Sequence, residues 1–174
     1  MPRHIRFVAL VVALLLPCAA RAEVKIAMAN RVKNKPPGRC GWCAVETLAR
    51  HHGLKALYDL TECSACRCCP SDLEAALAKA GIRYRVQKPG NTDPAILRYA
   101  IRKDLGAAVG FRELEPGAGG HIVTLVDFTD EGVKVIDPND SDRRTRTMTV
   151  ERFLYWWDGF ALVLETKSAR PARR

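Results

Sequence analysis

Residues 39–53, with the sequence RCGWCAVETLARHHG, constrain the fold of this chain more strongly than any other stretch. They follow Pro36-Pro37-Gly38, which cannot form regular structure, and apolar side chains recur at helical spacing from Cys43 onward. Gly53 is a typical residue after a helix C-terminus. We therefore predict a helix that starts near Cys40. The free N–H groups and the positive end of such a helix favour the thiolate form of Cys40, so this thiol is a candidate nucleophile.

The rest of the chain changes from helical to extended patterns near residue 104. Capping residues predict helices that begin after Ser71, after Thr92 or Asp93, and after Thr149. Apolar patterning predicts strands over 24–28, 82–86, 105–111, 121–128, 133–136 and 160–164, with a hairpin turn at 129–132. Helices lead and antiparallel strands follow, which predicts an α+β fold with an N-terminal helical lobe and a C-terminal antiparallel sheet lobe.

Residues 1–22 are predicted to be a secretory signal peptide. Two arginines precede an apolar run over 7–16, and Ala20-Arg21-Ala22 is a small-x-small cleavage site. The apolar run is too short to cross a membrane as a helix, so we expect no membrane span after signal removal. The mature protein is expected to begin near Glu23 and to be exported, to the periplasm or out of the cell. Residues 23–166 then form the single domain that this length predicts.

The net charge of +9 is concentrated at the two ends of the chain. Without the three arginines of residues 1–22 and the four basic residues of 167–174, the domain carries about +2 by the same count. We interpret residues 167–174 as a basic, disordered, solubilising tail. The domain has no stripe of basic and aromatic residues, so nucleic acid is not an expected partner.

Six cysteines remain after signal removal, and export favours their oxidation. If all six pair, no thiol is left for chemistry, whereas a free Cys40 leaves an odd number of partners. Adjacent Cys68 and Cys69 are not expected to pair with each other, because that geometry is strained. The disulfide candidates, which would join a cysteine-rich loop to the first helix, are Cys43, Cys63, Cys66, Cys68 and Cys69.

Three histidines remain in the mature chain, and they differ in their distance from Cys40. His51 and His52 lie more than ten residues further along the same predicted helix, so at about 1.5 Å per residue they are out of reach of its N-terminus. We interpret them as solvated helix-end side chains. His121 instead starts a predicted strand after a glycine loop, and Asp137 ends the neighbouring hairpin strand. The pair is consistent with an imidazole oriented by a carboxylate, or with a surface histidine beside an Asp-Pro turn.

In its ordered motifs, the stretch 34–164 resembles the papain-like cysteine peptidases that process bacteriocin leaders after a double glycine, and their secreted relatives. The closing Trp157-Asp158-Gly159-Phe160 also resembles the end of that family. The interval from Cys40 to His121 and the interval from His121 to Asp137 both suit it. The motifs that carry the resemblance are Cys40-Gly41, His52-Gly53, Gly120-His121 and Asp137-Pro138.

This resemblance implies a papain-like fold and a Cys-His-Asp triad that hydrolyses a peptide or amide bond through a thioester, without a cofactor. It implies Cys40 as nucleophile, His121 as general base and acid, and Asp137 as the orienting carboxylate, with a peptide or protein as substrate. The family usually has a glutamine six residues before the cysteine as an oxyanion donor. Here that position is Asn34, which carries the same amide on a shorter arm.

Other readings of the cysteines stay open at this point. A four-cysteine zinc site fits the spacing of two Cys-x2-Cys pairs, and its ligands would be Cys40, Cys43, Cys63 and Cys66. Cys40-Gly41-Trp42-Cys43 also has the spacing of a redox pair ahead of a helix. A third reading is a catalytically inactive relative that serves as a disulfide-stapled binding module. The sequence predicts neither the oligomeric state nor the residues that a substrate must carry.

Overall fold

The computed structural model describes residues 23–35, 37–63, 69–112 and 120–166. The predicted signal peptide 1–22 and the predicted basic tail 167–174 lie outside these ranges, as do the candidate disulfide residues Cys66 and Cys68. Cys63 is the last residue of a helix, but its side chain is not among those described. Those predictions therefore stay predictions.

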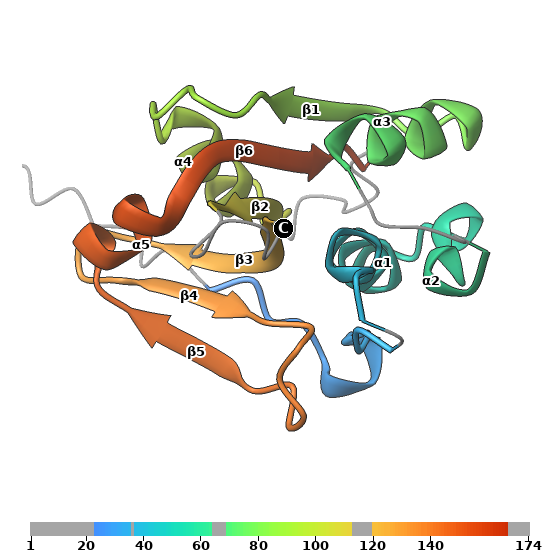
Figure 1. Cartoon of the computed structure of the whole chain (residues 1–174), viewed down its shortest axis with the longest axis horizontal. Coiled ribbons are helices and arrows are strands. Elements are labelled where there is room, and N and C mark those ends of the chain that lie inside the picture. The colour runs from blue at the N-terminus through green and yellow to red at the C-terminus, as the bar shows by residue number, and fades with distance from the viewer. Residues whose placement is uncertain (1–22, 36, 64–68, 113–119, 167–174) are drawn as a thin grey trace, which may run out of the picture.

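The described chain folds into one antiparallel sheet with helices packed around it (Figure 1). The helices are α1 (Cys40–His52), α2 (Leu60–Cys63), α3 (Pro70–Lys79), α4 (Ala95–Arg102) and α5 (Val150–Trp156), with the 3₁₀ turns η1 (Met28–Asn30) and η2 (Lys55–Leu57). The strands are β1 (Tyr84–Gln87), β2 (Ala107–Phe111), β3 (His121–Phe128), β4 (Val133–Ile136), β5 (Thr145–Met148) and β6 (Trp157–Leu164). Their order in the sheet is β1-β6-β2-β3-β4-β5, and every neighbouring pair is antiparallel. The predicted α+β class is confirmed.

The predicted first helix is confirmed as α1, and its central stretch is buried on all sides. Residues 41–49 are all buried, so no face of this stretch of helix lies open to solvent. The helix ends at Gly53, which adopts a left-handed conformation with φ of +70° and donates its N–H to carbonyls of the last turn. Apolar partners for α1 come from β3 and β2, which hold it beside the sheet. Its N-terminus is thereby fixed against the strands.

Strand β3 is the centre of the sheet lobe. Residues 122–128 are all buried, and both α1 and α4 pack against the strand. Because successive side chains of a strand point to opposite faces, this continuous burial means that both faces are covered. The predicted hairpin to β4 is confirmed, with Thr129 N donating to Gly132 O at 3.0 Å across the turn.

Three features differ from the sequence prediction. The stretch 24–28 is not a strand, although Val24 and Ile26 are buried as an alternating pattern requires. Helix α3 starts at Pro70 rather than after Ser71, because a proline lacks the N–H that a first helical residue leaves unused. The sheet also contains β5, a polar edge strand whose burial pattern carries no alternation for sequence reasoning to detect.

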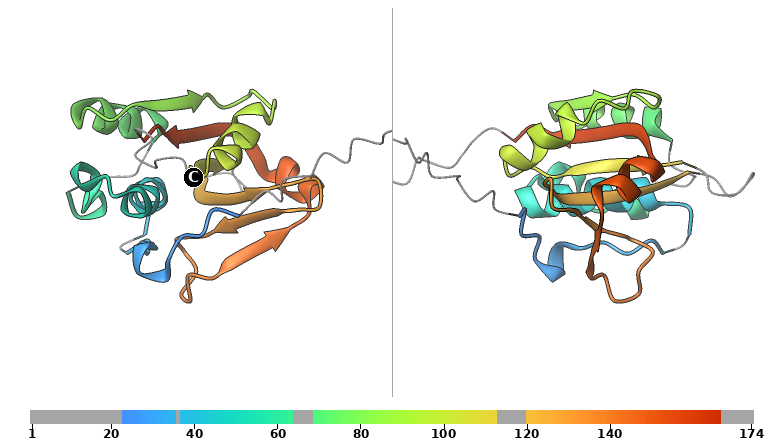
Figure 2. Two further views of the ribbon diagram at one scale, coloured as in Figure 1. Left: turned by 180° about the vertical axis from the view of Figure 1, so that it is seen from behind. Right: turned by 90° about the vertical axis from the view of Figure 1, so that its left-hand side faces the viewer.

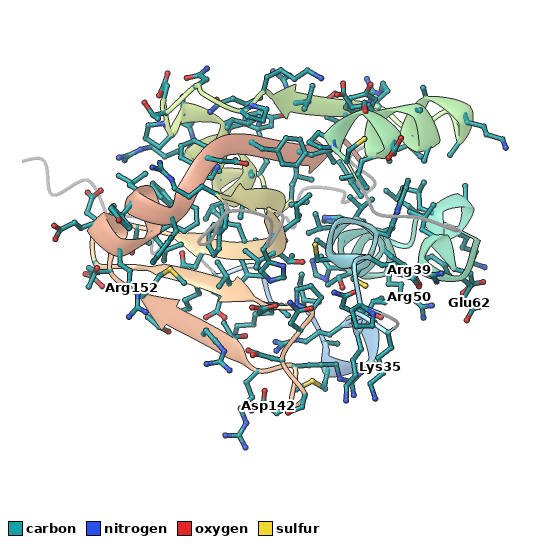
Figure 3. All side chains as sticks on the ribbon, in the orientation of Figure 1. Lys35, Arg39, Arg50, Glu62, Asp142 and Arg152 are labelled. Carbon is teal, nitrogen blue, oxygen red and sulfur yellow. The ribbon has the colours of Figure 1, made fainter. Side chains whose placement is uncertain are left out.

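The two lobes stand side by side in the molecule. In Figure 1, α1, α2 and α3 lie at the right of the sheet, and the view from behind in Figure 2 shows the same separation. Charged side chains such as Glu62, Asp142 and Arg152 lie at the periphery (Figure 3). Among the described residues, none of the helices has the length and apolar character needed to cross a membrane.

Candidate active site

Three side chains meet where the helical lobe faces the sheet. Cys40 is the first residue of α1, His121 is the first residue of β3, and Asp137 directly follows β4. His121 Nε2 lies 2.8 Å from Asp137 Oδ1, and a side-chain hydrogen bond links Cys40 to His121. The two side chains are therefore in contact, as an imidazole oriented by a carboxylate requires. The structure also brings Cys40 to the same imidazole, so the three groups form one hydrogen-bonded series.

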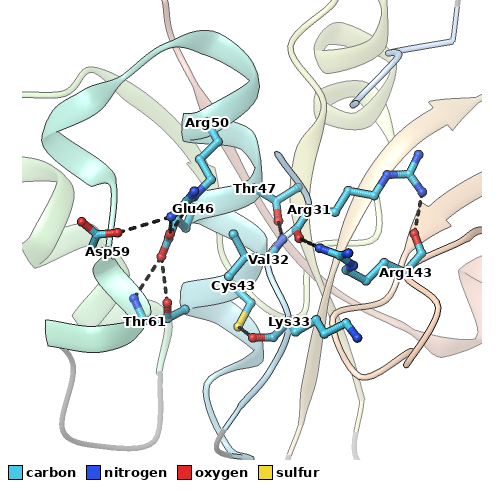
Figure 4. Close-up of polar contacts among 10 residues, drawn as sticks. All are labelled: Arg31, Val32, Lys33, Cys43, Glu46, Thr47, Arg50, Asp59, Thr61 and Arg143. Carbon is cyan, nitrogen blue, oxygen red and sulfur yellow. Dashed lines mark hydrogen bonds and ion pairs between the residues drawn. The ribbon is translucent and has the colours of Figure 1, made fainter. Parts of the chain in front are cut away.

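The position of Cys40 depends on how α1 is anchored to the segment before it (Figure 4). Val32 N donates to Thr47 Oγ1 at 3.0 Å, which ties the incoming chain to the second turn of the helix. Cys43 Sγ donates to Lys33 O at 3.3 Å on the same side. These contacts fix the loop that leads into Cys40.

A buried carboxylate anchors the opposite side of α1. Glu46 is almost completely buried and pairs with Arg50, one turn further on, at 2.7 Å. Its other oxygen accepts from Thr61 N at 3.1 Å and from Thr61 Oγ1 at 2.9 Å, and Arg50 reaches Asp59 at 3.3 Å (Figure 4). The network joins α1 to α2, so it holds the helix that carries Cys40.

The carboxylate of Asp137 is itself held in place. Asn139 N donates to Asp137 Oδ1 at 2.8 Å, in the turn that follows β4. Burial raises the pKa of Asp137, but the hydrogen bond and positive charge of His121, this N–H and the charge of Arg146 hold it below its ordinary value. Asp137 is therefore ionised and faces the imidazole with a negative charge.

The imidazole of His121 lies between two acidic groups. Its burial lowers the pKa, but the hydrogen bonds and negative charges of Asp137 and Cys40 outweigh burial and raise the pKa to about 9. Nε2 is bonded to Asp137, which leaves Nδ1 for the sulfur. His121 is consequently positively charged at neutral pH.

The thiol of Cys40 is shifted in the opposite direction. Burial raises its pKa, but the hydrogen bond and charge of His121 and the backbone N–H groups of Ile122 and Gly41 together lower it below the ordinary value. Sequence reasoning anticipated the helix end and His121. It missed the N–H of Ile122, the second residue of β3, which reaches the sulfur because β3 packs against α1.

Asn34 joins the loop before α1 to the turn that carries Asp137. Its backbone N donates to Pro138 O at 2.9 Å, and its Oδ1 accepts from Arg39 N at 2.9 Å. Its Nδ2 donates to Asn139 Oδ1 at 2.7 Å. The amide nitrogen predicted as an oxyanion donor thus uses one of its two hydrogens for Asn139. Asn139 was not singled out in the sequence, although it closes the Asp-Pro-Asn turn.

Cys43 differs from Cys40 although it lies only one turn away. It is a buried thiol in the structure and is not part of a disulfide. Burial, together with the charges of Cys40 and Glu46, raises its pKa to about 12. The structure therefore does not support Cys43 as a disulfide residue, because its Sγ is directed at Lys33 O. Cys69, another disulfide candidate, precedes α3 and hydrogen-bonds Asp72 and Ser71.

The remaining predicted groups lie away from this site or outside the described residues. Among the described side chains, no three metal-binding groups cluster around a common point. The zinc reading also needs Cys63 and Cys66, whose side chains are not described, so it is untested. His52 is at the far end of α1, as predicted, but the expectation of solvated histidines is wrong for it. It is half-buried, and its Nε2 lies 2.8 Å from Leu105 O.

Comparison with solved structures identifies the architecture. A double glycine motif protease from an AMS/PCAT transporter, in complex with a leader peptide, superposes with a TM-score of 0.59 over 84% of this chain and 96% of its own, at 15% identity. The peptidase domain of Streptococcus ComA, a bifunctional ABC transporter of a quorum-sensing pathway, gives 0.59 over 78% and 97%, at 21% identity. The chain has the fold of these peptidase domains.

A third solved structure gives the same result. The Streptococcus mutans ComA peptidase domain in complex with a small-molecule inhibitor has a TM-score of 0.51 over 78% of this chain and 98% of its own, at 18% identity. No family model and no curated protein sequence matches the chain. The predicted papain-like architecture is thus confirmed by structural likeness, and at these identities the likeness concerns the fold.

Proposed function

We propose that this protein is an exported cysteine peptidase that hydrolyses a peptide or amide bond. The observation that carries the proposal is the hydrogen-bonded series from Cys40 through His121 to Asp137, in which the pKa of the thiol is lowered and that of the imidazole is raised to about 9. Between these two values the site holds a thiolate beside an imidazolium. This ion pair supplies both a nucleophile and a proton donor.

In the first step, the Cys40 thiolate attacks the carbonyl carbon of the scissile bond and forms a carbon–sulfur bond. The imidazolium of His121 gives its proton to the leaving amine as the carbon–nitrogen bond breaks, and a thioester remains on Cys40. Asp137 keeps the ring oriented and stabilises its positive charge.

In the second step, neutral His121 takes a proton from a water molecule, which attacks the thioester. The product acid leaves, and the thiolate and the imidazolium are restored. One water is consumed for each bond cleaved, and no cofactor is required.

The oxyanion of each tetrahedral intermediate needs hydrogen-bond donors near Cys40. The N–H groups of the first turn of α1 have no carbonyl partner within the helix, and they point toward its N-terminus, where Cys40 lies. The Asn34 amide is the candidate side-chain donor, and its bonds to Arg39 and Asn139 limit its freedom.

Peptides are the proposed substrates, and leader-like segments that end in two glycines are the first to test. Support comes from the fold, which is shared with a double glycine motif protease solved in complex with a leader peptide. Export is proposed from the sequence Ala20-Arg21-Ala22 after an apolar run, with action in the periplasm or outside the cell.

Alkylation of Cys40 tests the ion pair without knowledge of the substrate. The purified protein is labelled with iodoacetamide at pH 6, and the rate at each cysteine is followed by mass spectrometry. We expect His121→Ala to slow labelling of Cys40 about a hundredfold, because an ordinary thiol is almost fully protonated at this pH. His51→Ala, at the far end of α1, is the matched control and should leave the rate unchanged. Equal labelling of the native protein and His121→Ala would contradict the proposal.

Cleavage is tested separately with synthetic peptides that carry a double glycine. The native protein is expected to release two fragments, and Cys40→Ala none. A reactive Cys40 without cleavage of any peptide would favour an inactive relative that binds peptides. Stoichiometric zinc that is lost in Cys63→Ser would favour the four-cysteine metal site instead.

A further inference from the structure

A second buried carboxylate lies far along β3 from His121. Asp127 is only 9% exposed, and its Oδ1 is buried without a hydrogen-bond partner among the described residues. Its Oδ2 lies 3.7 Å from Lys134 Nζ, on the neighbouring strand β4. Burial of a carboxylate oxygen without a donor is unfavourable, so this atom marks a place where a cation, an N–H group or a water molecule would bind.

The start of the described chain lies beside this carboxylate. Val24 N donates to Val126 O at 2.9 Å, which places residue 24 against the strand position that precedes Asp127. Lys134 Nζ reaches Glu23 Oε2 at 2.7 Å as well as Asp127. Glu23 and Asp127 therefore share one lysine. The backbone nitrogen of Glu23 is one residue, or about 3.5 Å of chain, from the amide that is bonded to Val126.

The charges of this cluster do not balance. Two carboxylates, Glu23 and Asp127, face the single ammonium of Lys134, which leaves one negative charge in a site where Asp127 is buried. A second positive charge at the backbone nitrogen of Glu23 would balance the cluster and could donate to Asp127 Oδ1. A backbone amide carries no charge, but a chain terminus does.

The sequence offers a way to produce that terminus. Ala20-Arg21-Ala22 is the predicted cleavage site, so the bond between Ala22 and Glu23 is the one that a leader-removing peptidase would hydrolyse. Addition of one water breaks this carbon–nitrogen bond and leaves a carboxylate on Ala22. The amine on Glu23 takes up a proton and becomes an α-ammonium group.

We propose that processing between Ala22 and Glu23 creates an α-ammonium group that binds the buried carboxylate of Asp127 and completes the fold of the mature protein. The proposal rests on the predicted processing site and is independent of the peptidase function. Before cleavage, Asp127 keeps its unpartnered oxygen and the domain is less stable. After cleavage, the new terminus locks the first residues onto β3 and β4.

The contribution of the terminus to stability can be measured by a double-mutant cycle. One protein begins at Glu23, and another carries one additional glycine before it, which moves the ammonium by about one residue. Both are unfolded in urea at pH 7, with native Asp127 and with Asp127→Asn. We expect the glycine to lower the folding equilibrium constant about tenfold with Asp127, as one pKa unit of stabilisation implies, and to have no effect with Asp127→Asn. Asp130→Asn, an exposed carboxylate of the same hairpin, is the control that should keep the full effect of the glycine.

A direct measurement does not depend on the folding of any variant. In the protein that begins at Glu23, the α-amino group is labelled with ¹⁵N and titrated by NMR. We expect its pKa to lie about one unit above the ordinary value of about 8, because Asp127 and Glu23 stabilise the charged form more than Lys134 opposes it. An ordinary α-amino pKa, or an unchanged folding constant after the glycine is added, would overturn the proposal. So would an exported protein whose first residue is not Glu23.

Discussion

Cys40 and His121 each make the other's charge stable, and Asp137 biases the pair toward separation of charge. Burial acts against ionisation of all three groups, yet the pKa of Cys40 and that of Asp137 are lowered while that of His121 is raised. The hydrogen bonds and opposite charges within the series therefore outweigh desolvation. The consequence is a pH window, bounded below by the pKa of Cys40 and above by that of His121 at about 9, in which the ion pair exists.

Asp137→Asn should narrow, from both sides, the pH range in which the thiolate of Cys40 and the imidazolium of His121 coexist. Loss of the negative charge lowers the pKa of His121 by about one to two units. Because His121 is then positively charged less of the time, it stabilises the thiolate less, and the pKa of Cys40 rises. The midpoint of the pH dependence of Cys40 alkylation should move to higher pH. The NMR titration midpoint of His121 should move to lower pH.

A neighbouring carboxylate provides the control for this change. Asp142 is exposed in the turn that follows β4 and pairs with Arg144 at 3.3 Å. Asp142→Asn should leave both midpoints in place. If Asp137→Asn also leaves both in place, Asp137 has no electrostatic role in the pair.

At the residue scale, the sequence predicted the reacting groups but not the residues that hydrogen-bond them and hold them in place. Cys40, His121 and Asp137 carry chemical signatures that spacing can place on elements. The role of Ile122 N depends on how β3 packs against α1, and that of Asn139 depends on a turn conformation; neither has a signature in a single sequence. Asn34 was singled out as an amide donor, but its bond to Asn139 could be seen only in three dimensions.

At the scale of elements, α1 and the β3–β4 hairpin are the parts that the sequence predicted best. Both follow local rules: an apolar period that ends at Gly53, and two apolar strands joined by a four-residue turn. The place of β1 beside β6 follows from contacts between residues far apart in the chain, and β5 lacks apolar alternation. Neither is encoded in a local pattern.

Helix α1 is unusual because it buries a carboxylate, that of Glu46, among side chains that are mostly apolar. Glu46→Ala should destabilise the domain by about 2–3 kcal/mol, since it leaves the N–H and hydroxyl of Thr61 without their acceptor and removes an ion pair that is partly screened at Arg50. Urea unfolding followed by circular dichroism measures the loss.

Glu62→Ala gives the comparison for Glu46→Ala. Glu62 is exposed on the short helix α2, which also carries Thr61, and its removal should change the free energy of unfolding by less than about 0.5 kcal/mol. If both variants lose the same free energy of unfolding, the buried hydrogen bonds and ion pair of Glu46 do not stabilise the domain.

At the scale of the whole molecule, the candidate site exists only where the two lobes meet. Cys40 comes from the helical lobe, while His121, Asp137 and the N–H of Ile122 come from the sheet. The N–H of Gly41 in α1 also lowers the pKa of the thiol, but the larger contributions, from His121 and Ile122, come from the sheet. The reactivity of Cys40 is therefore a property of the packing of α1 against β3 rather than of the helix end by itself.

Cys43 supplies an internal reference for this dependence, because it shares the helix with Cys40 but has a pKa raised to about 12. In the folded protein at pH 7, iodoacetamide should label Cys40 at least about a hundredfold faster than Cys43.

As urea is increased, the labelling rates of Cys40 and Cys43 should converge in the same transition in which the circular dichroism of the domain is lost. Convergence at a lower urea concentration would mean that the lobes separate before they unfold. Fast labelling of Cys40 that persists after the sheet has unfolded would mean that the helix end alone activates the thiol, and that His121 is not its partner.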